Sequence, residues 1–132
     1  MASNKIIRFG PVALTTTTTT NVLNPPTLTG GVGVSGTNTY IVIRHIRITN
    51  KTASAAQVAL WIGATGANTA GTEAVFGGVA SAGALTRGVS IAGQSYVDWY
   101  GQLRLDPADF LVGGSDTATA LTFEAEGEIG LV

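Results

Sequence analysis

The sequence predicts an all-β protein: a single antiparallel β-sandwich or jelly-roll-like domain with an extended N-terminal arm. The chain of 132 residues is rich in threonine, valine and isoleucine, whose branched side chains fit a pleated, half-buried surface. Its 18 glycines gather between the apolar runs, where turns are expected. No segment repeats apolar residues at helical spacing over ten or more positions. We therefore expect about eight short strands, with residues 1–36 as the arm and residues 37–132 as the sandwich.

The predicted arm begins with a short apolar patch and continues through a run of threonines at 15–20. Pro25 and Pro26 follow, and two successive prolines favour an extended or turned backbone. A glycine-rich stretch at 30–36 ends the segment. The threonine run is either an edge strand of the sandwich or an extended segment that pairs with a neighbouring subunit. The second alternative is open because a strand added to a sheet edge gains main-chain hydrogen bonds.

The longest strand is predicted over residues 38–50, and its apolar side chains change phase along it. Four isoleucines show this change, two on each parity: Ile41, Ile43, Ile46 and Ile48. Because side chains alternate between the two faces of a strand, all four reach one core only if the strand contains an extra residue. We therefore predict a β-bulge near Arg44 and His45.

Shorter strands are expected along the remainder of the chain. A polar turn at 51–54 leads to an alternating strand over 55–62, and we expect this strand to form a β-hairpin with the preceding one. Further strands are predicted at 73–79, 84–91, 95–105 and 110–112.

The final predicted strand has apolar residues on one face and three glutamates on the other: Glu124, Glu126 and Glu128. Strand geometry places these carboxylates about 6.8 Å apart along the chain. Carboxylates at such a distance can hydrolyse glycosides or bind calcium. We interpret them instead as a solvated strand face, where a row of like charges also discourages edge pairing.

Charges are few and unevenly distributed. Only 11% of the residues are charged, and the net charge of −1 gives no field that would favour nucleic acid or an anionic membrane as a partner. Residues 1–72 contain five basic side chains and no acidic one, whereas residues 73–132 contain two basic and eight acidic ones. Either strands from the two halves alternate and neutralise each other, or a basic face of one copy meets an acidic face of the next.

The sequence offers little for catalysis or for a cofactor. The chain has no cysteine, which excludes disulfides, thiolate metal sites and cysteine nucleophiles. Its one histidine, His45, lies within a strand beside Arg44, and we interpret it as structural. Residues 31–36 match a dinucleotide-binding fingerprint in letters only, because a strand is expected after them where the motif needs a helix. We expect no enzymatic activity, no cofactor and no bound metal.

The aromatic side chains are concentrated at Trp61, Tyr96, Trp99 and Tyr100. An exposed row of such rings would suit stacking against a sugar. Tyr96 and Tyr100 share a parity, but Trp99 has the opposite one, so we expect core packing and interface anchoring.

Two segments resemble a recurring small β-sandwich protein of tailed bacteriophages: residues 41–64, IVIRHIRITNKTASAAQVALWIGA, and residues 89–114, VSIAGQSYVDWYGQLRLDPADFLVGG. The shared pattern is an apolar strand ending in Thr-Asn, a polar turn, a second apolar strand, and a later aromatic strand before an Asp-containing turn. The similarity covers roughly residues 38–132 and includes no catalytic motif. It implies a structural protein of the virion, made in the host cytoplasm and without enzymatic activity.

The resemblance allows two placements in the particle. The first is a decoration protein on the capsid surface, a trimer or other cyclic oligomer bound to the major capsid protein. The second is a component of the tail or baseplate. A third hypothesis, from the aromatic residues, is a carbohydrate-binding module for host attachment. For assembly we expect interface residues in three groups, which are Ile6, Ile7, Phe9, Thr15 and Thr20 of the arm, Arg44 and Arg47 of the long strand, and Glu124, Glu126 and Glu128 of the last strand.

Overall fold

The computed structural model describes residues 5–17, 21–23, 39–63, 74–76, 79–81, 84–86, 88–107 and 109–131. These residues form β-strands joined by turns and irregular segments, and they contain no helix, so no helix among them could cross a membrane. The strands are β1 (Lys5–Ala13), β2 (Asn21–Leu23), β3 (Thr39–Asn50), β4 (Ala56–Gly63), β5 (Ala74–Phe76), β6 (Val79–Ser81), β7 (Ala84–Thr86), β8 (Val89–Ile91), β9 (Tyr96–Leu105), β10 (Phe110–Ser115) and β11 (Leu121–Leu131).

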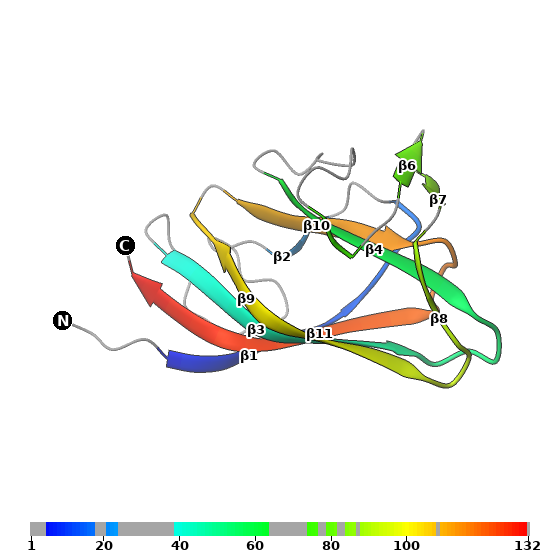
Figure 1. Ribbon diagram of the computed structural model, residues 1–132, viewed down its shortest axis with the longest axis horizontal. Helices are drawn as coiled ribbons and strands as arrows, with labels where there is room; N and C mark the ends of the chain where they lie inside the picture. The colour runs from blue at the N-terminus through cyan, green and yellow to red at the C-terminus, as the bar shows by residue number, and fades with distance from the viewer. Residues whose placement is uncertain are drawn as a thin grey trace.

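The strands form two antiparallel sheets that face each other, which confirms the predicted β-sandwich (Figure 1). Sheet A has the order β1-β11-β3-β9. Sheet B has the order β2-β10-β4-β5, and β8 also pairs with β4. The strands β6 and β7 pair separately with each other.

Apolar side chains from both sheets meet in one core between the layers. The alternation predicted for the last strand is confirmed, because Leu121, Phe123 and Ala125 are buried, while the three glutamates occupy the alternate positions from 124 to 128 and point outward. All four isoleucines of β3 are likewise fully buried. Burial of these side chains is the main force that holds the two sheets together.

The bulge predicted in β3 is confirmed at Arg44. On β11, the neighbours Gly127 and Glu126 pair with Ile43 and His45, so Arg44 has no counterpart. Gly127 permits this close approach, since a Cβ at that position would collide with the carbonyl oxygen of Val42. The extra residue restores the inward phase of the following isoleucines.

The predicted hairpin between the strands at 38–50 and 55–62 is wrong. Strand β3 pairs with β11 and β9 in sheet A, whereas β4 pairs with β10, β5 and β8 in sheet B. The turn between them is a corner that carries the chain from one sheet to the other. Asn50 fills this corner and is 1% exposed, and its Nδ2 donates to the carbonyl oxygens of Ser54 and Ile91.

The description of residues 1–36 as an arm needs correction where the structure describes them. Strand β1 is an edge strand of sheet A paired with β11, and β2 pairs with β10 in sheet B. Phe9, Leu14, Val22 and Leu23 are all buried in the core, which requires these segments to be part of the sandwich. Residues 1–4, 18–20 and 24–38 lie outside the described residues, as do Pro25 and Pro26.

Candidate interaction surface on the outer face of sheet A

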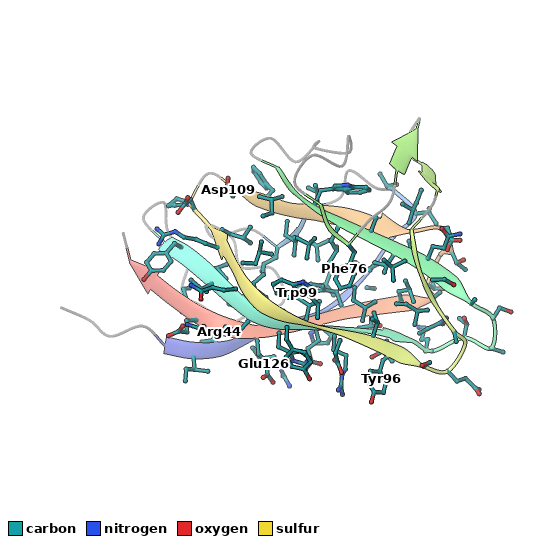
Figure 2. The ribbon with its side chains drawn as sticks, in the orientation of Figure 1. Arg44, Phe76, Tyr96, Trp99, Asp109 and Glu126 are labelled. Atoms are coloured by element: carbon teal, nitrogen blue, oxygen red, sulfur yellow. The ribbon has the colours of Figure 1, made fainter. Side chains whose placement is uncertain are left out.

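The side of sheet A that points away from sheet B forms a broad polar surface. Figure 2 shows Tyr96 and Glu126 projecting from this side, while Trp99 and Phe76 lie between the sheets. We call the surface face A, and its residues are Ile6, Arg8, Arg44, His45, Arg47, Tyr96, Asp98, Tyr100, Arg104, Glu124, Glu126 and Glu128. Strand pairing aligns them in rows across the sheet, so side chains distant in sequence become neighbours.

An ion-pair network joins β3 and β9 on face A. The guanidinium of Arg47 donates to both carboxylate oxygens of Asp98, at 2.8 Å from Nε and 3.0 Å from Nη2. His45 Nε2 lies 2.8 Å from the same carboxylate. The hydrogen bonds from Arg47 and then from His45 lower the pKa of Asp98 to about 2. The same carboxylate raises the pKa of the Arg47 guanidinium.

The network also holds two exposed tyrosine rings. The guanidinium carbon of Arg47 lies 4.3 Å from the centre of the Tyr96 ring, a cation–π contact. The ring of Tyr100 stacks on His45, with centroids 4.6 Å apart and planes inclined by 13°. Both rings are therefore held in place although Tyr96 is 56% and Tyr100 is 72% exposed.

A shallow groove of about 270 Å³ lies at the other side of face A, near β1. It is lined by Ile6, Arg44, His45, Glu126, Gly127 and Glu128. Nε of Arg44 donates to Glu128 at 2.9 Å, which fixes one wall. Glu126 has no hydrogen bond or ion pair with the described residues, so its carboxylate is open to an external donor.

The charge pattern of the sequence is explained by these contacts. Strand β3, from the basic half of the chain, lies between β9 and β11 from the acidic half. The pairs Arg44–Glu128 and Arg47–Asp98 each join one residue from each half. Of the two alternatives, the structure supports neutralisation between strands of one chain.

Some of the predicted interface residues lie on face A, and others do not. Arg44, Arg47, Glu124, Glu126 and Glu128 all lie on face A, together with Ile6, which is 85% exposed. Ile7 is partly buried and packs against the core.

Two further residues of that prediction, Phe9 and Thr15, lie away from face A. Phe9 is fully buried and is not available to a partner, so its assignment to an interface is wrong. Thr15 is exposed beyond the end of β1, where its carbonyl oxygen accepts a hydrogen bond from the amide of Ser115. Thr20 lies outside the described residues.

Six residues of face A were not among the predicted interface residues: Arg8, His45, Tyr96, Asp98, Tyr100 and Arg104. The equal parity of the two tyrosines was the available signal, and the structure confirms that Trp99 points the other way and packs against the core. Asp98 carried no signal, because its contact with Arg47 depends on the register between two strands distant in sequence.

The outer side of sheet B is very different. Ala59, Trp61, Leu85 and Val112 form a second apolar cluster there, and Phe110 packs against it. Trp61 is fully buried, and its indole N–H has no hydrogen-bond partner among the described residues. A role for Trp61 in stacking against a sugar is therefore excluded by its burial.

Within the described part of the chain, no group of three His, Asp or Glu side chains is placed to hold a metal ion. No protein-family model matches the chain, and neither a curated protein nor a solved structure is matched to it.

Proposed function

We propose that this protein is a non-enzymatic structural subunit of a tailed-phage particle, a capsid decoration protein that self-associates and binds the major capsid protein through face A. One observation carries this proposal. The large apolar side chains that are exposed among the described residues, Ile6, Tyr96 and Tyr100, all lie on face A. The resemblance of residues 38–132 to phage β-sandwich proteins supplies the kind of particle.

The chemistry of face A suits a protein partner. Exposed apolar side chains collected on one surface mark interaction sites, and tyrosine is enriched among the residues that dominate binding energy. The rings of Tyr96 and Tyr100 are already held by Arg47 and His45, so little side-chain entropy is lost when a partner binds to them. Glu126 adds an acceptor that a partner's amide or basic group can use.

Co-sedimentation with isolated phage capsids tests the proposal. The full chain should pellet with capsids, and Tyr100→Ala should weaken this binding about tenfold or more, the loss expected for a tyrosine that anchors an interface. Lys51→Ala is the matched control, because Lys51 is exposed in the turn between the sheets and is not one of the residues that form face A. Equal binding by the wild type and the Tyr100 variant would refute face A as the docking surface.

Deletion of the first twenty residues is not a suitable test. It would remove β1 together with Phe9 and Leu14, which are buried in the core. Loss of binding by such a variant would report unfolding and not the loss of a contact.

A tail or baseplate position is the alternative within the same class of protein. In this alternative, face A binds a protein of the tail or baseplate in place of the major capsid protein. Co-sedimentation with purified tails, and none with capsids, would identify that alternative.

A saccharide-binding role is favoured by one specific observation, the two fixed and exposed tyrosine rings beside the planar Arg47–Asp98 pair. Aromatic faces stack on the C–H face of a pyranose, and planar charged groups bind its hydroxyls. A glycan array with the wild type and Tyr96→Ala tests this second candidate. Binding of a glycan that Tyr96→Ala abolishes would favour host attachment over a purely structural role.

A further inference from the structure

Strand β9 is an exposed edge of sheet A. Among the described strands it pairs with β3 alone, and it lies along the side of the sandwich that faces the viewer in Figure 1. It is ten residues long. In an antiparallel sheet, alternate residues of an edge strand direct their N–H and C=O groups away from the sheet, where another strand can pair with them.

The other edge of sheet A, strand β1, is poorly suited to such pairing. Pro11 has no N–H to donate, and the register of β1 against β11 shifts between Phe9 and Val12. Both a proline and an irregular register are recognised means of protecting an edge strand, and of the two β9 has only the irregular register.

Strand β9 lacks the strongest of these protections. It contains no proline and no lysine, and its two charged residues, Asp98 and Arg104, are engaged within their own chain. Asp98 is held by Arg47, while Arg104 pairs with Asp106 and lies 4.3 Å over the Tyr40 ring. Its one irregularity is the pair Gly101 and Gln102, which together oppose Arg44 on β3.

We infer that β9 pairs antiparallel with β9 of a second copy of this chain, about a two-fold axis that passes near Gly101. This arrangement joins the two A sheets into one continuous sheet. It places Asp98 opposite Arg104 of the second copy, and Arg104 opposite the second copy's Asp98.

The sequence of β9 is complementary to itself in this register. Asp98 and Arg104 both lie on face A, because their β3 partners, Arg47 and Val42, pair with the outward-facing Glu124 and Glu128. Opposite charges directly across a strand pair are favourable. The same register brings the exposed ring of Tyr100 against Gln102 of the second copy.

The inward side of β9 agrees with this register. Its inward residues are apolar and pack against the core: Val97, Trp99, Leu103 and Leu105. Pairing Trp99 with Leu103 of the second copy, and Val97 with Leu105, matches apolar with apolar at these positions, while Gly101 opposes itself. A shift of one residue would oppose inward residues with outward ones, so the register is well specified.

The inference deepens the self-association within the proposed function and does not depend on a phage partner. A protein that dimerises but ignores both capsids and tails would refute the phage role and leave the β9 pairing intact. A protein that binds capsids as a monomer would support the phage role and refute the β9 pairing.

Sedimentation equilibrium over a range of concentrations is the first test. We expect a monomer–dimer equilibrium, and Arg104→Glu should weaken the dimer about tenfold or more because it places Glu opposite Asp98. Lys51→Glu, which makes the same kind of charge change in the exposed turn, should leave the dimer unaffected. A monomer at all concentrations, or a trimeric or larger ring, would overturn the inference, because a two-fold pairing closes at two copies.

Site-directed cross-linking tests the register independently of any loss of stability. The chain contains no cysteine, so introduced thiols are the only ones present. A mixture of Tyr100→Cys and Gln102→Cys chains should form a disulfide-linked heterodimer under a mild oxidant. A mixture of Tyr96→Cys and Gln102→Cys chains should not, because those positions are far apart in the proposed register. Equal cross-linking in both mixtures would refute the register.

Discussion

The outer faces of the two sheets have opposite character. The outer face of sheet B carries the apolar cluster around Trp61, which is fully buried, and its central strand β4 is therefore buried on both faces. The outer face of sheet A carries paired charges and exposed tyrosines. The difference supports our proposal that partners bind to sheet A, because the outer face of sheet B is taken up by its own apolar packing.

Substitution of Trp61 should give the largest effect on stability. Trp61→Ala removes the centre of the second apolar cluster and should lower the free energy of unfolding by about 3–5 kcal/mol. Trp61→Phe keeps most of the apolar volume and removes an indole N–H that has no hydrogen-bond partner in the described part of the chain, so it should cost much less. Chemical denaturation measures both values.

Tyr100→Ala is the matched aromatic substitution on face A. Because the ring is largely exposed, this change should lower stability by no more than about 1 kcal/mol, the loss of one stacking contact. Equal losses at Trp61 and Tyr100 would contradict the contrast between the two outer faces.

Substitution of Asn50, at the corner between the sheets, should cause the second-largest loss of stability. Its Oδ1 accepts hydrogen bonds from the amide and hydroxyl of Thr52, in addition to the two bonds donated by Nδ2. Asn50→Ala removes all four of these hydrogen bonds, including the buried one to the carbonyl oxygen of Ile91, and should cost about 1–3 kcal/mol. Asn50→Asp keeps an acceptor for Thr52 but places a buried carboxylate against the carbonyl oxygens of Ser54 and Ile91, so near neutral pH it should cost at least as much, and thermal unfolding of both variants compares the two losses.

Asp98 should make the stability of sheet A depend on pH. Its pKa is about 2 in the folded protein, against 3.8 for the free side chain. The carboxylate therefore stabilises the folded state above pH 3.8, and this contribution is lost as the pH falls through about 2. Asp98→Asn should be less stable than the wild type near neutral pH, and the difference should shrink between about pH 4 and pH 2. A constant difference across this range would refute the role of the Arg47–Asp98 pair.

Loss of the exposed ion pair Arg44–Glu128 should have the smallest effect on stability. The two side chains are 53% and 25% exposed, so their attraction is screened by water and salt. Glu128→Gln should change the free energy of unfolding by about 0–1 kcal/mol. A double-mutant cycle with Arg44→Ala measures the interaction directly, and a value well above this range would show that face A is more rigid than its exposure indicates.

The sequence by itself determined the features that depend on alternation within one strand. The inward apolar residues of β11, the outward glutamates and the bulge at Arg44 all follow from the period of two, because side chains on one parity share one face. The parity of Tyr96 and Tyr100 likewise placed them together and separated them from Trp99.

Only the tertiary structure decided which strands pair and what covers each outer face. The apolar and polar pattern of β3 and β4 fits a hairpin as well as a corner, and the corner forms because each strand has its partners elsewhere in the chain. Arg47 meets Asp98 across 51 positions, and Phe9 enters the core through pairing with the C-terminal strand. Such contacts depend on the register between distant segments, and local periodicity contains no information about that register.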